Sequence, residues 1–223
     1  MIDLMEKIVS LCKRRGFIFQ SSEIYGGFNS CYDFGPLGVE MKNNIKLAWW
    51  QEMTRKQENI VGLDSSILMS PKVWQASGHL TAGFSDELVE CKKCHHRFRK
   101  EFLKKNKCPD CEGELTQPRK FNLMMKTFVG PVEDEASQTY LRAETCQGIY
   151  MNFENVLNSM RLKIPFGIAQ IGKAFRNEIN PKDFIYRIRE FEQMEMEWFC
   201  QPRDADKFFD YWQKERIKWY LSL

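Results

Sequence analysis

Four cysteines in two pairs constrain the fold of this chain more than any other feature. Cys91 and Cys94 form one CxxC pair, and Cys108 and Cys111 form a second pair after thirteen intervening residues. Each pair can present two thiolates from one tight turn, and four thiolates complete the tetrahedral coordination of a structural Zn²⁺ ion. The spacing therefore predicts a zinc-organised insertion without an open coordination position. Free thiols and a redox pair remain alternatives, and His95 or His96 could replace one cysteine ligand.

The other four cysteines are scattered singly through the sequence, at positions 12, 31, 146 and 200. Asp3, Glu6 and Lys7 interrupt the region where a secretory leader would need an apolar run. We therefore expect a reduced, cytoplasmic setting, in which CxxC pairs bind metal more often than they form disulfides.

The overall composition excludes two classes of protein. A hydrophobic share of 43% and an aromatic share of 13% are too high for a disordered chain. The longest apolar stretches are shorter than the roughly 20 residues that a membrane span needs, so no membrane partner is expected. The net charge of +3 neither requires nor excludes a nucleic-acid partner.

Positive charge is concentrated next to the cysteines. Residues 91–107 contain one acid, Glu101, and eight basic residues: Lys92, Lys93, Arg97, Arg99, Lys100, Lys104, Lys105 and Lys107. These side chains could face RNA phosphates or form an ordinary solvated surface, and the sequence favours neither. The change of composition predicts an insertion at 91–118 between two parts of one core, residues 1–90 and 119–223.

The hydrophobic periodicity predicts an α+β fold. Helical spacing of apolar residues occurs over 3–15, 37–55, 144–160 and 204–221. A short strand is expected at 59–63. Residues 166–200 are typical of two strands joined by a turn near 180–183, which would pair them antiparallel.

The second of these strands alternates between two kinds of side chain. Its even positions include Ile188, Met194, Met196 and Trp198, and its odd positions carry Arg187, Arg189, Phe191, Gln193, Glu195 and Glu197. Because side chains along a strand point alternately to opposite faces, we expect the even face to pack on the core. The odd face then offers arginines for phosphate, a ring for stacking on a base and carboxylates for an ammonium group. A plain solvent-facing strand would alternate in a similar way.

Several segments, in order along the chain, resemble the homodimeric glycyl-tRNA synthetases, which are class II aminoacyl-tRNA synthetases. The segments are RGFIFQSSEIYGG, YDFGPLGVEMKNNIKLAWW (motif 1), SPKVWQASGH, FNLMMKTFVGP, LRAETCQGIYMNF, and GKAFRNEI with RIREFEQMEME (motif 2). The resemblance implies an antiparallel sheet flanked by helices, with a small zinc-ribbon-like insertion. One departure is that the family's RPETAQG is RAETCQG here, with Ala143 and Cys146 as replacements.

The resemblance also implies an activity, that of a glycine–tRNA ligase. Such an enzyme joins glycine to the AMP part of ATP, accompanied by Mg²⁺, as glycyl-adenylate with release of pyrophosphate. It then transfers glycine to tRNA(Gly) and releases AMP. A homodimer formed through the motif 1 helix, residues 37–55, is expected; Trp49 and Trp50 are large for a monomer surface, although core packing would explain them equally well. Motif 3 and an anticodon-binding domain are not recognised, so we expect an incomplete fragment with poor activity of its own. The alternative is a non-catalytic, zinc-bearing RNA- or partner-binding fragment of the same fold.

Individual roles follow from the motif positions. The resemblance implies that Arg176 contacts the α-phosphate of ATP and that Glu178 lies near the adenine amine, as the catalytic pair. The implied ATP-binding residues are Arg176, Asn177, Glu178, Tyr186, Arg187, Ile188, Arg189, Glu190 and Phe191. The implied glycine- or substrate-binding residues are Arg99, Glu144, Phe191, Glu192, Gln193, Met194 and Glu195. From local sequence alone, Glu144 could instead be an acid that stabilises a helix N-terminus.

Overall fold

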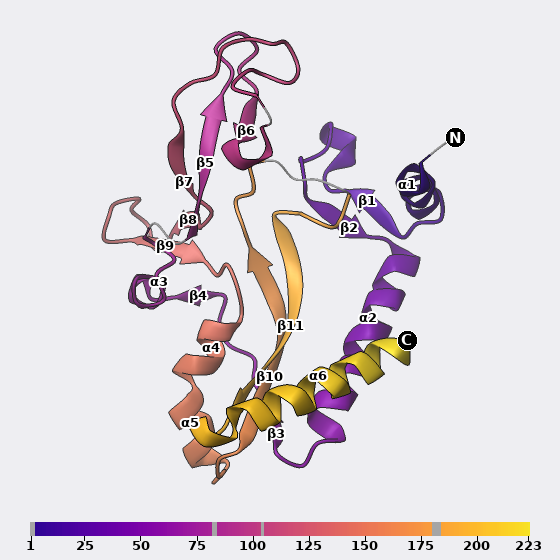
Figure 1. The fold of residues 1–223 in the computed structure, drawn as a ribbon, viewed down its shortest axis with the longest axis vertical. Helices are drawn as coiled ribbons and strands as arrows, with labels where there is room; N and C mark the ends of the chain where they lie inside the picture. Colours follow the sequence, from indigo (N-terminus) through magenta and orange to yellow (C-terminus); the bar gives the residue numbers. More distant parts are fainter. Residues whose placement is uncertain (1–2, 82–83, 104, 180–183) are drawn as a thin grey trace.

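The protein, described here from a computed structural model, has an α+β fold with four small sheets in the part of the chain that the structure describes, and helices lie around the central one (Figure 1). The structure describes residues 3–81, 84–103, 105–179 and 184–223. The turn expected near 180–183 lies outside the described residues. Among the described residues, no helix combines the length and the apolar character that crossing a bilayer requires.

The central sheet contains the two long strands that the sequence predicts. β10 (Phe166–Phe175) and β11 (Glu190–Phe199) pair antiparallel over their full length, from Phe166 opposite Phe199 to Phe175 opposite Glu190. β3 (Ile60–Gly62) lies on the other side of β10 and runs parallel to it. The expected antiparallel pairing is present in β10 and β11, and β3 adds a parallel pairing that the sequence did not predict. The long connection between β3 and β10 carries the chain back to the same end of the sheet, which is what a parallel pair requires.

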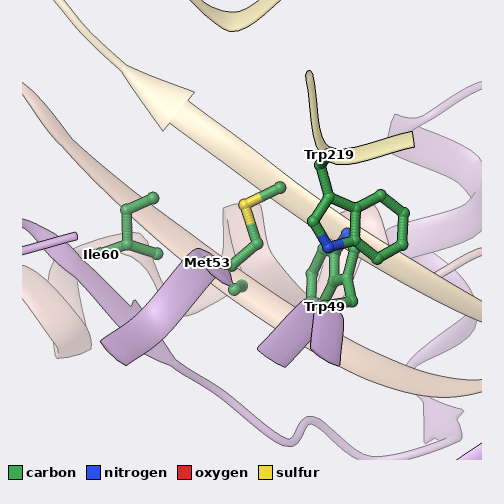
Figure 2. Packing of buried hydrophobic residues seen from close by; sticks show 5 residues of the cluster. Trp49, Met53, Ile60 and Trp219 are labelled. Atoms are coloured by element: carbon green, nitrogen blue, oxygen red, sulfur yellow. The ribbon is translucent and has the colours of Figure 1, made fainter. Parts of the chain in front are cut away.

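Two helices cover the even face of β11. They are α2 (Pro36–Trp50), which continues as a π-helical turn (Gln51–Arg55), and α6 (Ala205–Leu221). The core between these elements contains the buried residues Trp49, Met53, Ile60, Ala169 and Trp219. Against these residues pack three side chains of β11: Met194, Met196 and Trp198. Figure 2 shows Trp49, Met53 and Trp219 gathered at this contact. The core-facing role of Met194, Met196 and Trp198 is confirmed, and Trp49 is a core residue.

Helices also cover one end of the odd face. α4 (Cys146–Met151) and α5 (Phe153–Ser159) bury Ile149 and Val156 against Phe166 and Ile168. The sequence predicts a single helix over 144–160, whereas the structure has two helices that meet at Asn152. The Asn152 side-chain amide donates to the Gly148 carbonyl at 2.8 Å. Such local side-chain bonding competes with the regular helical backbone pattern.

The remaining elements surround the other end of the central sheet. β4 (Leu68–Met69), β9 (Gln138–Leu141) and β8 (Met125–Phe128) form a second sheet beside α3 (Pro71–Ala76). The N-terminal region contains α1 (Leu4–Arg14), β1 (Ile18–Gln20), a 3₁₀ turn (Glu23–Tyr25) and β2 (Tyr32–Phe34). At the end of the sheet covered by α4 and α5, a 3₁₀ turn (Pro202–Asp204) follows β11 and precedes α6.

The cysteine-bearing insertion belongs to a sheet of its own, at the top of Figure 1. This sheet contains β6 (Arg97–Arg99), β5 (Ser85–Glu90) and β7 (Arg119–Asn122), and the 3₁₀ turn Lys100–Phe102 follows β6. Since β5 lies before residue 91 and β7 lies after residue 118, the compositional boundaries fall inside this unit.

Candidate functional site

The open part of the odd face brings together side chains from three segments. Phe191, Gln193 and Glu195 lie on β11, Glu144 lies in the loop between β9 and α4, and Arg176 follows β10 directly. The residues opposite the three β11 side chains are Ala174, Gly172 and Gln170. Cross-strand neighbours share one face of a sheet, so these three β10 residues lie beside the β11 side chains, and the Arg142 guanidinium covers Gly172, where a Cβ atom would meet Arg142 Nη2 at 2.1 Å.

Glu144 is held from one side. Its Oε1 accepts hydrogen bonds from Gln147 Nε2 at 2.6 Å and from Cys146 Sγ at 3.3 Å, and it lies 3.1 Å from His79 Nε2. Its Oε2 lies 3.8 Å from Arg176 Nη2. Burial by itself raises the pKa of this carboxyl, but the two hydrogen bonds and the nearby His79 and Arg176 hold the pKa below its ordinary value. Glu144 is therefore a carboxylate at neutral pH.

Glu195 is a second carboxyl on the same face, and its environment differs. The Thr145 hydroxyl donates to Glu195 Oε2, and the Thr145 backbone N–H donates to Gln193 Oε1 at 3.1 Å. Burial raises the pKa of Glu195, and the charges of Glu197 and Glu144 raise it further. The hydrogen bond from Thr145 lowers this pKa but does not offset the increase. A cation placed between Glu144 and Glu195 would relieve this repulsion, so the site favours a positively charged group.

Arg176 joins these carboxyls to an aromatic surface. Its Nε donates to the Ala143 carbonyl at 3.2 Å, and its guanidinium lies 5.4 Å from the ring centroid of Phe191 and 5.6 Å from that of Phe84. The Arg176 side chain remains 31% exposed. A guanidinium that is reachable from solvent and lies beside a ring can receive a phosphate that is attached to a base.

A second cluster ties the insertion to the end of β10. Arg99 forms ion pairs with Asp86 and with Glu178, the latter at 3.2 Å. Arg99 is 8% exposed and Glu178 is 6% exposed. Arg189 donates to the Glu178 carbonyl at 3.2 Å and to the Asn29 carbonyl at 2.7 Å. These three predicted site residues are committed to protein partners in this structure and stabilise the segment that follows Arg176.

Some predicted residues are not brought to the odd face. Glu192 binds Lys42 at 2.8 Å and Lys46 at 2.6 Å on the side of α2, and Met194 packs in the core. Glu190 pairs with Lys173, and Ile188 is buried. Because side chains alternate along a strand, a run of consecutive residues cannot share one face, and this corrects the expected grouping of Glu192 and Met194 with Glu195.

The other three predicted ATP residues lie outside the regular strands. The Asn177 backbone N–H donates to the Leu123 carbonyl at 2.8 Å. Tyr186 is 85% exposed, and Arg187 is partly buried beside it.

Sequence reasoning missed three residues of the site: Thr145, Gln147 and His79. Thr145 and Gln147 flank Glu144 at positions one and three residues further on, so a helical start after Glu144 could have suggested them. His79 is 65 residues away from Glu144 in the sequence, and no local pattern links the two.

The four paired cysteines converge. Cys91 Sγ lies 3.5 Å from Cys111 Sγ, Cys94 Sγ lies 3.6 Å from Cys108 Sγ, and all four sulfur atoms lie within 4.8 Å of one another. The backbone N–H groups of Cys94 and Lys93, together with the neighbouring thiols, lower the pKa of Cys91 to about 6. This compact set of sulfur donors fits a tetrahedral Zn²⁺ ion.

The charged residues around the cysteines make local contacts. His95 lies 3.4 Å from Glu90 and His96 lies 2.5 Å from Asp110, although Cys94, His96 and Asp110 also form a group with possible ligand spacing. Several of the basic side chains pair with acids of the same unit: Lys92 with Glu114, Arg97 with Glu90, and Lys100 with Glu87. These pairs reduce the positive charge that the insertion presents.

The chain was compared with known proteins by sequence. A family model described as the tRNA synthetase class II core domain (G, H, P, S and T) matches residues 128–223. The chain is 62% identical over 221 residues to a glycine–tRNA ligase of Treponema denticola, covering 97% of this chain and 49% of the relative. It is 58% identical over 221 residues to one of Borreliella burgdorferi, covering 98% and 49%. A Treponema pallidum ligase is 56% identical, covering 97% and 47%. The chain thus spans about half the length of the curated relatives it matches.

A solved structure agrees at the level of the fold. The chain is similar, with a TM-score of 0.56 and 19% sequence identity, to the structure titled as the RNA binding domain of threonyl-tRNA synthetase from Cryptosporidium parvum Iowa II. The similarity covers 92% of this chain and 42% of that chain.

Proposed function

We propose that the site of this chain, a relative of the glycine–tRNA ligases with a class II core segment, activates glycine with ATP for transfer to tRNA(Gly). One observation carries the proposal. Arg176, Phe191 and the two carboxyls of Glu144 and Glu195 converge on one face of β10 and β11. This arrangement provides neighbouring places for a phosphate, a base and an ammonium group.

The first chemical step joins glycine to the α-phosphorus of ATP. A carboxylate oxygen of glycine attacks the α-phosphorus in line, the bond from that phosphorus to the bridging oxygen breaks, and pyrophosphate leaves with glycyl-adenylate formed. Arg176 stabilises the negative charge that builds on the α-phosphate, and Phe191 stacks on the adenine. Mg²⁺ accompanies the ATP phosphates and neutralises part of their charge. A ribose hydroxyl at the tRNA end then attacks the glycyl carbonyl carbon, and AMP leaves.

The two carboxyls bind glycine through its ammonium group. Glu144 is ionised at neutral pH, and Glu195 lies on the same face with a raised pKa. An ammonium group between them replaces a like-charge repulsion with two attractions. Binding through the ammonium group leaves the glycine carboxylate free to act as the nucleophile toward the phosphate held by Arg176.

We also propose that the insertion is a zinc-ribbon-like unit. Cys91, Cys94, Cys108 and Cys111 would hold one structural Zn²⁺ ion, because their sulfur atoms already lie within 4.8 Å of one another. The ion would stabilise the β5–β6 hairpin. That hairpin positions Arg99 for its ion pair with Glu178, so the metal would stabilise the site indirectly and take no part in the chemistry.

The assembly of the whole protein is part of the proposal. We propose a homodimer in the cytoplasm. The homodimer is supported by α2, where Leu37, Met41 and Ile45 are exposed at four-residue spacing and form an apolar stripe. The eight free cysteines agree with a reducing compartment.

The test of the proposed function is binding of a non-hydrolysable glycyl-adenylate analogue, followed by glycine-dependent ATP–pyrophosphate exchange. We expect the parent chain to bind the glycyl analogue more tightly than the matching alanyl analogue. Arg176→Ala should weaken binding by about 1.5–3 kcal/mol, which is roughly 10- to 150-fold, because a charge-assisted contact is lost. Arg203→Ala, whose side chain is 84% exposed, is the matched control and should bind as the parent does. A parent chain that binds RNA but neither analogue would support the non-catalytic alternative instead.

A further inference from the structure

His79 contacts the carboxylate that is proposed to hold the substrate ammonium group. Its Nε2 lies 3.1 Å from Glu144 Oε1, and its ring is 8% exposed. We infer that His79 is a positioning residue, which orients Glu144 so that only Oε2 is presented to the ammonium group. The inference rests on the proposed function for the identity of the ligand, but the contact itself does not depend on that function.

The two oxygens of Glu144 have unequal surroundings. Oε1 is occupied by Gln147 Nε2 at 2.6 Å, by Cys146 Sγ at 3.3 Å and by His79. Among the described residues, Oε2 has one ion-pair contact, Arg176 Nη2 at 3.8 Å, which is longer than a hydrogen bond. A carboxylate oxygen accepts about two hydrogen bonds, so Oε1 is saturated and Oε2 retains its capacity for a ligand.

The imidazole of His79 is itself fixed from several directions. Ser77 Oγ lies 2.9 Å from His79 Nδ1, just after α3. The ring meets Trp74 edge-on, with centroids 5.3 Å apart, and lies 4.6 Å from the ring of Phe84. The His79 carbonyl accepts from Asn122 Nδ2 at 2.8 Å. Ring and backbone are therefore held, which is what a residue that orients another side chain needs.

The hydrogen-bond chain determines where the imidazole proton lies. When the Ser77 hydroxyl donates to Nδ1, the neutral ring carries its hydrogen on Nε2 and donates it to Glu144. When the ring is protonated, both nitrogens donate, and Ser77 Oγ becomes an acceptor whose own hydrogen can turn to the Trp74 carbonyl, 3.5 Å away. The contact to Glu144 is kept in both states. The charged or titratable groups that also face Glu144 are Arg176, Cys146 and Glu195.

Two substitutions separate hydrogen bonding from packing. His79→Phe keeps an aromatic ring between Trp74 and Phe84 but cannot donate to Glu144. His79→Gln places an amide N–H near the position of Nε2. We expect His79→Phe to weaken binding of the glycyl-adenylate analogue about tenfold while ATP binding stays unchanged, and we expect His79→Gln to restore most of the loss.

Two NMR measurements test the contact independently of ligand binding. Carboxyl ¹³C titration should give a higher pKa for Glu144 in His79→Phe than in the parent, with His79→Gln in between. Nitrogen-15 shifts of His79 in the parent chain should show the hydrogen on Nε2. A hydrogen on Nδ1 in the neutral ring of the parent overturns the inference even where the variants fold poorly or the analogue does not bind. An unchanged Glu144 pKa in folded His79→Phe overturns it as well. Absence of analogue binding by the parent, with both NMR results as expected, would count against the proposed function alone.

Discussion

At the scale of single residues, the site works by giving two carboxyls different environments. Glu144 receives hydrogen bonds that favour its charged form, whereas burial and two like charges disfavour the charged form of Glu195. Thr145 lies between them in the fold, since it follows Glu144 in the chain and its hydroxyl donates to Glu195. One residue thereby couples the loop before α4 to strand β11.

The raised pKa of Glu195 has a consequence for stability. Folding raises this pKa, so the folded state holds the proton more tightly than the unfolded state. Stability from this group is therefore fully present below the ordinary pKa of a glutamate and is lost as the pH rises through the higher folded value. We expect Glu195→Gln to have a higher free energy of unfolding than the parent at pH 7.5 and to lose less stability between pH 4.5 and pH 7.5. Urea unfolding at both pH values measures this difference.

The same substitution should weaken binding of the glycyl-adenylate analogue, because the ammonium group loses one of its two charged partners. Glu135→Gln, at an exposed loop position, is the control and should change neither quantity. A parent-like pH dependence in Glu195→Gln would show that another group causes the shift.

At the scale of elements, close approach of backbone decides how α2 lies on the N-terminal strands. Gly38 is buried in the first turns of α2, and a Cβ atom at this position would lie 1.9 Å from the Phe17 carbonyl oxygen. Backbone cannot yield as a flexible side chain can. The absence of a side chain at Gly38 therefore allows the helix to pack at this distance.

Gly38→Ala should destabilise the protein although alanine is the better helix former. We expect a loss of about 1–3 kcal/mol in the free energy of unfolding, because overpacking outweighs the helix propensity gain of about 1 kcal/mol. Asn44→Ala, at an exposed position of the same helix, should be neutral or slightly stabilising. Equal stability of Gly38→Ala and Asn44→Ala would show that α2 can shift away from Phe17 at no cost.

The insertion can be tested as an element through its metal. Freshly reduced protein should carry about one Zn²⁺ ion per chain. Cys108→Ser should lose the ion and expose residues 91–118 to hydrogen exchange, while β10 and β11 keep their protection. Cys12→Ser, which changes a cysteine outside the cluster, should retain the metal. Elemental analysis that finds no zinc in the reduced parent would contradict the zinc proposal.

At the scale of the whole molecule, the last helix closes the core that the first half of the chain begins. Trp219 of α6 is 7% exposed and packs with Trp49 and Met53 from the end of α2 and with Ile60 of β3. Residues more than 150 positions apart in the sequence thus form one cluster (Figure 2). The even face of the central sheet depends on this cluster for its cover.

Truncation of Trp219 should therefore be costly. We expect Trp219→Ala to lower the free energy of unfolding by about 3–5 kcal/mol, as is usual when a large buried aromatic side chain is removed. Leu221→Ala, two residues further on and 83% exposed, should change it by no more than about 0.5 kcal/mol. Chemical denaturation of both variants would separate the two cases, and similar stabilities would show that α6 is not part of the cooperative core.

The local features of this protein could be predicted from its amino-acid sequence. Hydrophobic periodicity predicts the α+β class and the helices near 3–15, 37–55 and 204–221. It also predicts the burial of Met194, Met196 and Trp198. The CxxC spacing correctly indicated that the four sulfur atoms meet. These features depend on residues that are close in the chain, and strand and helix periods decide which of them share a face.

The contacts between distant segments could not be predicted, because they depend on how the whole chain packs. Four contacts join residues that no local pattern relates. They are the parallel pairing of β3 with β10, the core position of Trp49, the ion pair of Arg99 with Glu178 and the contact of His79 with Glu144. The resemblance grouped Glu192 and Met194 with Glu195, although strand alternation separates them and Lys42 and Lys46 of α2 hold Glu192 on the other face. A local sequence pattern specifies the face on which a side chain lies, but the partner on that face depends on how the whole chain packs.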